Sequence, residues 1–251
     1  MRRSYLCALL FSSAFAVASP AMVQAATITA FTFDSLTTGI NNSPAPTTGS
    51  GTASPLGMTN SFTSPASTTS ADVLNNPGST TPTQAWRIRG GGTGSGNGWA
   101  AAAPQYSQGS QYLVDTTGYE DIVLTYDWSP TTMGVKHQQV QYTTDGSVWT
   151  NIGLIVAGPA TEGWVNGITV DLSTIPAVDN NALFGVRIVS AYAPDGPNAG
   201  QYVNLAGNPI NSTSGNWRMD SVVISGTLIP EPGTVGLLAA CALGLLPRRR
   251  G

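Results

Sequence analysis

A single histidine limits the chemistry that this sequence can perform. His137 lies in the polar segment 136–139, and both cysteines, Cys7 and Cys241, lie in apolar end segments. A zinc site needs several Cys, His or carboxylate ligands, and a Ser-His-Asp arrangement would have to use this one imidazole ring. The body of the chain also lacks a thiol nucleophile and cannot form an internal disulfide. We therefore expect a solvated strand position for His137 and no catalytic role.

Carboxylates are the remaining candidates for catalysis. Glu120, Asp121, Asp127 and Glu162 could in principle supply an acid and a base for glycoside hydrolysis. Retaining hydrolysis needs two carboxyl groups about 5 to 5.5 Å apart across a cleft, and the sequence spacing does not place any two of these side chains so. We expect most of them at turns or on the surface. The sequence thus favours a protein without catalytic activity, and a secreted hydrolase acting on glycans is the alternative.

Tryptophans could provide a stacking platform for sugars. The chain has six, and most should pack in the core, Trp128 among them, since large aromatic side chains are usually buried. Trp99 and Trp164 are the candidates for glycan contact because their surroundings are rich in glycine. The ligand we expect is a neutral or cationic glycan, bound weakly through exposed aromatic rings.

Two aspartates suggest the one candidate metal site. Asp34 follows the first expected strand and Asp220 lies within the last, and these two strands are neighbours in many sandwiches. The pair could begin a structural calcium site, with backbone carbonyls and water completing the six to eight oxygens that Ca²⁺ prefers. The alternative is that both carboxylates pair with Arg87 or Arg218 or face solvent. No other cofactor is expected.

The charge of the body argues against nucleic-acid binding. Residues 26–229 hold five basic and twelve acidic residues, so their net charge is 5 − 12 = −7. Nucleic-acid binding depends mainly on clustered Lys and Arg side chains that neutralise phosphates. The sequence has no such cluster in the body.

Period-two patterns predict an all-β fold. Apolar residues alternate with polar ones over 122–128 and 184–188, as in half-buried strands. Asp145-Gly146 separates two alternating runs, which is a strong hairpin signal. Other segments bring the total to about nine strands without an amphipathic helix. We expect one antiparallel β-sandwich of the jelly-roll type over 26–227.

One long segment lacks these patterns. Of the 47 residues in 37–83, 36 are Ser, Thr, Asn, Gly or Pro. Such a composition buries little apolar surface, so we expect a loosely ordered loop. Its expected tethers are Leu56, Phe62, Val73 and Leu74.

Three segments of the body carry a family resemblance. The QYTTDGSVWT hairpin, the VDLS strand and the closing NWRMDSVVISG strand resemble concanavalin-like and carbohydrate-module-like sandwiches of exported bacterial proteins. The resemblance covers about residues 84–226. Its motifs are structural, so it implies a fold rather than an activity.

The N-terminus has the features of an export signal. Arg2 and Arg3 precede an apolar run, and small residues then occupy the positions that signal peptidase recognises. We expect residues 1–25 to form a signal peptide that is cleaved between Ala25 and Ala26. An uncleaved N-terminal anchor is the alternative, although the apolar run is shorter than the roughly 20 residues that a membrane span needs.

The C-terminal segment 228–251 has three parts in order. A Pro-Glu-Pro motif precedes an apolar stretch over about 233–247, and a basic cluster closes the chain. The fourteen residues 233–246 would span about 21 Å as a helix, against a hydrocarbon core of about 30 Å. This length suits a transient membrane stop with its basic end in the cytoplasm. The motif and the cluster consist of Pro230, Glu231, Pro232, Arg248, Arg249 and Arg250.

This tail resembles that of the PEP-CTERM proteins of bacteria. The resemblance implies sorting by a membrane transpeptidase of the exosortase type, with cleavage near the Pro-Glu-Pro motif. Pro247 departs from the pattern because it would end or kink the helix. A Pro-rich linker before an ordinary short anchor is the alternative. We expect a protein of the cell envelope, held in the membrane before processing, whose sandwich could bind extracellular polysaccharide.

Overall fold

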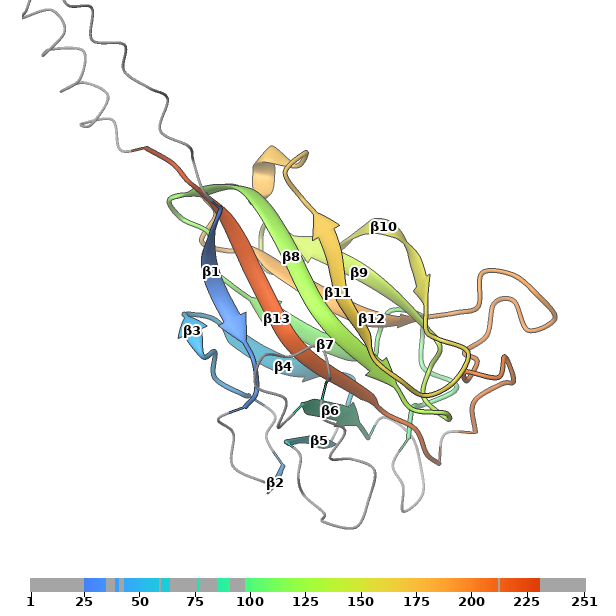
Figure 1. Ribbon diagram of the computed structural model, residues 1–251. Helices are drawn as coiled ribbons and strands as arrows, with labels where there is room; N and C mark the ends of the chain where they lie inside the picture. Colours follow the sequence, from blue (N-terminus) through green and yellow to red (C-terminus); the bar gives the residue numbers. More distant parts are fainter. Residues whose placement is uncertain are drawn as a thin grey trace, which may run out of the picture.

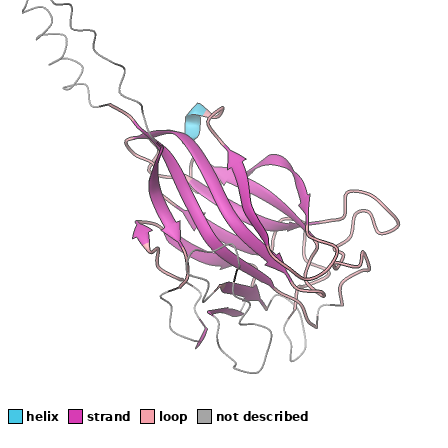
Figure 2. Cartoon of the chain, in the orientation of Figure 1, coloured by secondary structure: helices cyan, strands magenta, loops and turns pink. Residues whose placement is uncertain are grey.

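Two antiparallel sheets make up the fold. The computed structural model describes residues 25–34, 39–40, 43–58, 60–63, 76, 85–90, 98–211 and 213–230. In this part of the chain the secondary structure consists of strands and one 3₁₀ turn, η1 (Pro176–Val178), as Figure 2 shows. None of the described elements is a helix long and apolar enough to cross a membrane. The all-β prediction is therefore confirmed.

The large sheet has eight described strands, arranged around a long central pair (Figure 1). Its main path runs in the order β11, β8, β13, β6, β5 and β2, and β1 pairs with both β13 and β3. Its strands are β1 (Ala25–Phe31), β2 (Gly39–Ile40), β3 (Thr48–Gly49), β5 (Asn60–Thr63), β6 (Trp86–Arg89), β8 (Tyr119–Pro130), β11 (Val165–Asp171) and β13 (Trp217–Leu228).

The small sheet has five strands in the order β10, β9, β12, β7 and β4. They are β4 (Thr52–Leu56), β7 (Gly109–Leu113), β9 (His137–Thr143), β10 (Thr150–Ala157) and β12 (Gly185–Ala191). The two sheets pack face to face as a sandwich (Figure 1).

The first and last strands of the body are neighbours, as the sequence suggested. One end of β13 pairs with β6 and the other with β1, while β8 runs along its opposite side. β13, with twelve residues, therefore contacts three strands of the large sheet along its length.

Strand alternation places the aromatic residues between the sheets. In β6, Trp86 and Ile88 are fully buried in the core. Trp217 and Met219 of β13 are fully buried in the same core. The ring of Trp217 lies 5.2 Å from that of Trp128, centroid to centroid. The intervening residues therefore lie on the opposite face of the large sheet.

The hairpin prediction at Asp145-Gly146 is confirmed. Strands β9 and β10 pair antiparallel on either side of it. The backbone N–H groups of Ser147 and Val148 each donate to Asp145 Oδ1 at 2.8 Å, and these bonds lower the pKa of Asp145 to about 2. Gly146 has a φ of +75°, a conformation that glycine adopts readily.

The prediction of a loosely ordered loop over 37–83 is wrong for residues 43–58. β4 forms an edge of the small sheet by pairing with β7, and Ala53 is completely buried. Backbone bonds also hold the approach to this strand, since Thr47 N–H donates to the Ala30 carbonyl at 2.8 Å. An edge strand is fixed largely by main-chain bonds, so the polar composition did not prevent order. Leu56 lies in β4, whereas Val73 and Leu74 lie outside the described residues.

The two segments that we expect to act in targeting lie largely outside the described residues. The described residues begin at Ala25, which is the first residue of β1, and they end at Pro230. The expected signal peptide, the apolar helix over about 233–247 and the basic cluster are thus not described.

Candidate functional site

A polar site lies on the large sheet, on the face turned away from the small sheet. In β6, Arg87 and Arg89 alternate with the core residues, and Arg218 of β13 pairs in register with Arg87. Three of the five basic residues of the body thus gather on one face, although they are far apart in the sequence. Strand pairing brings these arginines together, and the net charge of −7 on residues 26–229 gives no indication of it.

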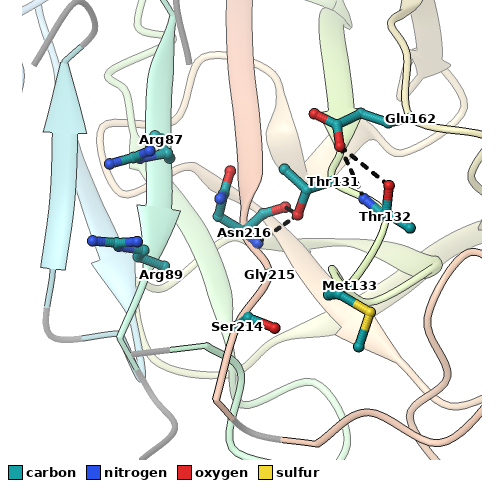
Figure 3. A pocket seen from close by; sticks show the side chains of 9 residues that line it. All are labelled: Arg87, Arg89, Thr131, Thr132, Met133, Glu162, Ser214, Gly215 and Asn216. Carbon is teal, nitrogen blue, oxygen red and sulfur yellow. Dashed lines mark hydrogen bonds between the residues drawn. The ribbon is translucent and has the colours of Figure 1, made fainter. Parts of the chain in front are cut away.

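These strands border an open pocket of about 310 Å³, which we call the arginine pocket. Figure 3 shows the arginines of β6 on one side, the loop after β8 with Glu162 on the other, and Asn216 between them. The lining residues are Arg87, Arg89, Thr131, Thr132, Met133, Glu162, Ser214, Gly215 and Asn216.

An ion pair fixes the carboxylate of the pocket. Arg218 Nη1 donates to Glu162 Oε1 at 2.8 Å, and the side chains are 3% and 29% exposed. The other oxygen, Oε2, accepts hydrogen bonds from the backbone N–H and the hydroxyl of Thr132 at 3.1 and 3.3 Å. Glu162 therefore has a defined orientation at the rim (Figure 3).

Asn216 has a side-chain acceptor for which the described residues provide no donor. Its backbone is well bonded, because its carbonyl accepts from Thr131 N–H at 3.0 Å and its N–H donates to the Thr131 hydroxyl at 2.9 Å. The residue is 8% exposed, and its side-chain Oδ1 has no hydrogen-bond partner among the described residues. Buried polar atoms are seldom left unpaired, so such an atom in a pocket indicates a missing donor.

Gly215 lets the backbone pass close to the loop after β8. It has a φ of +94°, and a Cβ atom there would lie 2.1 Å from the Met133 carbonyl oxygen. Only glycine fits this conformation and approach without strain. Both residues of this contact line the arginine pocket.

A buried acid pair lies on the same face of the large sheet. Asp127 and Asp220 are directly opposite each other in β8 and β13, and both are buried. The Asn76 amide group donates to Oδ2 of Asp127 at 2.6 Å and to Oδ2 of Asp220 at 3.0 Å. Gly167 N–H donates to the other Asp127 oxygen, and Ser221 N–H donates to the other Asp220 oxygen.

Asp220 has a raised pKa. Burial raises the pKa to about 7, and the charges of Asp34 and Asp127 add to this effect, while the bonds from Asn76 and Ser221 oppose it. Near neutral pH the group therefore holds a proton for part of the time.

The candidate calcium site takes a different form from the one the sequence suggested. Asp34 lies near enough for its charge to act on Asp220, but the partner across the strands is Asp127. All four oxygens of the Asp127–Asp220 pair accept N–H donors, which a cation would have to displace. The described residues contain no group of three or more His, Cys, Asp or Glu side chains arranged for a metal ion.

Trp99 does not face solvent, so the prediction that it contacts a glycan is wrong. Its side chain is fully buried, and its ring centroid lies 4.6 Å from that of Trp217. Gly98 allows this position because its Cα packs directly against the backbone of Ser214. Trp164, the other candidate, is half-buried immediately before β11. Its role as a glycan contact stays a prediction.

His137 is less accessible than the sequence suggested. It is 8% exposed, so the prediction of a solvated strand position is wrong. It borders a cavity of about 190 Å³ together with Lys136 and Asp195. Burial lowers its pKa, the charge of Lys136 lowers it further, and Asp195 opposes both. The imidazole is therefore neutral near pH 7.

Comparisons with known proteins do not assign a family. No family model and no curated protein matches the chain. Among solved structures, the chain is similar to the CBM22-1–GH10 modules of Clostridium thermocellum xylanase 10B complexed with xylohexaose. The identity is 10% and the TM-score 0.32, over 62% of this chain and 24% of that one.

A second similar structure is the enzymatically active domain of bacteriophage CBA120 tailspike protein 4. The identity is 10% and the TM-score 0.31, over 71% of this chain and 19% of that one. The chain thus spans about a quarter or less of the length of these two structures. At these TM-scores the similarities carry no inference about function.

Proposed function

We propose that this is an exported, non-catalytic protein of the cell surface or extracellular matrix, which binds polysaccharide weakly through the arginine pocket. The Pro-Glu-Pro motif, apolar stretch and basic cluster support sorting by an exosortase-type transpeptidase. Signal peptidase would act first, near Ala25. The membrane would hold the chain only until the tail is processed.

The unpaired Asn216 Oδ1 is the observation that carries the binding proposal. A sugar hydroxyl can donate to this acceptor and at the same time accept from a guanidinium N–H. The pocket offers both kinds of group within about 310 Å³, and it is open to the surface as a polymer ligand requires. Recognition would thus depend on hydrogen bonds rather than on the exposed aromatic rings that the sequence suggested.

Titration calorimetry of the processed protein against polysaccharides tests this proposal. The panel should contain neutral, amino-sugar and uronic-acid polymers, each at two salt concentrations. Asn216→Ala removes the unpaired acceptor and should weaken binding about fivefold, the effect of losing about 1 kcal/mol.

Asn208→Ala is the matched control, because Asn208 is exposed and lies outside the pocket. It should bind like the unaltered protein. If no polymer binds, or if both variants lose affinity equally, the arginine pocket is not the binding site.

A secreted glycan hydrolase is the second candidate. The Asp127–Asp220 pair favours it, because one carboxyl group that keeps its proton near neutral pH is what a general acid requires. However, Asp220 is completely buried, and Glu162 is the only carboxylate among the described residues that line the arginine pocket. Release of reducing ends from the same polymers, abolished by Asp220→Asn, would establish the hydrolase instead.

A further inference from the structure

One row of polar side chains crosses all five strands of the small sheet. The strand register places each member of the row directly opposite the next. Neighbouring strands lie about 4.8 Å apart, so the row extends about 19 Å from β4 to β10. Its members, in the order β4, β7, β12, β9 and β10, are Ser54, Gln111, Arg187, Gln141 and Asn151.

This polar row lies on the outer face of the small sheet. Successive side chains of a strand point to opposite faces, and Val186 and Ile188, on either side of Arg187, are fully buried in the core. Tyr112, which follows Gln111, belongs to the same core. The arginine pocket lies on the outer face of the large sheet, so the sandwich separates it from the polar row (Figure 1).

Two contacts fix the orientation of Arg187. Its Nε donates to Gln111 Oε1 at 2.8 Å, and its guanidinium carbon lies 3.7 Å from the ring centroid of Trp149. The Nη1 and Nη2 groups of this guanidinium form no hydrogen bond with the described residues. Because the plane of the guanidinium is already fixed, a ligand that accepts from both Nη groups loses little affinity to side-chain ordering.

The charge of Arg187 is not balanced within the polar row. The row contains no acidic residue, and no carboxylate of the described residues forms an ion pair with Arg187. The side chain is half-buried, and burial lowers its pKa, although a guanidinium stays charged at neutral pH. A partly desolvated charge without a partner is unfavourable, so the site favours an anionic ligand. Exposed acidic groups more than about 8 Å away are largely screened at physiological ionic strength.

We propose that the polar row binds a polysaccharide that contains uronic acids, with one sugar carboxylate at Arg187. The two Nη groups donate to the two carboxylate oxygens, a planar match that an ammonium group does not provide. Gln141 Nε2 donates to Asn151 Oδ1 at 2.9 Å, which leaves the exposed Asn151 amide group as a donor for hydroxyls of the next sugar. This ligand differs from the neutral or cationic glycan that the sequence suggested, and its site is independent of the arginine pocket.

Titration calorimetry of the full chain in detergent, with tetragalacturonate and with its methyl ester, tests the proposal. The ester keeps the sugar hydroxyls but has no charge. The unaltered protein should bind the acid about tenfold more tightly than the ester. Arg187→Gln should abolish this preference. Arg187→Lys keeps the charge without the planar fork, so it should reduce the preference about threefold, and it replaces Arg187→Gln if thermal melts show that variant to be unfolded.

Lys136→Gln is the matched control, because it also removes one positive charge and Lys136 lies outside the polar row. This variant should keep the tenfold preference. Asn216→Ala acts on the arginine pocket, so it should keep the preference even if it weakens binding of neutral polymers. Equal affinity of the unaltered protein for acid and ester would overturn the proposal. Equal losses in Arg187→Gln and Lys136→Gln, or a loss of the preference in Asn216→Ala alone, would do the same.

Discussion

The buried carboxyl group of Asp220 should make the protein less stable as the pH rises to neutrality. The pKa of this group is raised from 3.8 to about 7 in the folded protein, chiefly by burial. Between these values the folded state binds more protons than the unfolded chain, so the free energy of unfolding falls as the pH increases. The stabilising contribution is complete below the unfolded pKa and is lost as the pH passes through about 7.

The structure gives the size of the effect. A pKa difference between 3.8 and about 7 corresponds to about 4 kcal/mol, at about 1.4 kcal/mol for each pH unit. Asp220 is completely buried, so screening by solvent reduces this figure little. Relative to a typical stability of about 5 to 15 kcal/mol, the loss is large enough to measure by urea unfolding.

Asp220→Asn removes the titrating group and isolates its contribution. The free energies of unfolding of the variant and of the unaltered protein should be compared at about pH 4 and pH 8. The substitution also weakens the hydrogen bond that the Asn76 amide donates to Asp220 Oδ2. This penalty does not depend on pH, so it cancels when the two pH values are compared. The advantage of the unaltered protein over the variant should fall by about 4 kcal/mol between the two conditions.

Asp115→Asn is the control with the opposite sign. Asp115 is exposed, and its bonds with Thr117 lower its pKa, so its small contribution grows as the pH rises. If the difference between Asp220→Asn and the unaltered protein is the same at both pH values, the carboxyl group is not held protonated and the reasoning is refuted.

Three further predictions follow from the core, the pocket and the ends of the chain. Trp99→Ala should lower the free energy of unfolding by about 3 to 5 kcal/mol in urea titrations, as a core truncation does, and a loss below about 1 kcal/mol would contradict the burial of this ring. Gly215→Ala should lower the melting temperature, because its Cβ atom would meet the Met133 carbonyl, and an unchanged melting temperature would contradict that approach. Intact-mass analysis of the envelope fraction should find a chain that begins near Ala26 and ends near the Pro-Glu-Pro motif, and recovery of the full 251 residues would reject processing.

The sequence by itself determined which face of a strand each residue occupies. The alternation over 122–128 is local, and the period of two places Ile122, Leu124 and Trp128 on one side whatever the neighbouring strands are. The hairpin at Asp145-Gly146 is also local, since the turn residues and the strands they join are consecutive. These features could therefore be predicted and were confirmed.

Apart from the hairpin and the pairing of the first strand with the last, only the tertiary structure decided which strands are neighbours. The arginine pocket brings β6, the loop after β8, Glu162 and the approach to β13 together, and no local pattern encodes these pairings. The burial of Trp99 depends in the same way on Trp217, which lies more than a hundred residues away. From the sequence, a glycine-rich segment is expected to be an exposed loop. Glycines also allow two backbones to pack closely, and the distant partner determines whether the segment is exposed or packed.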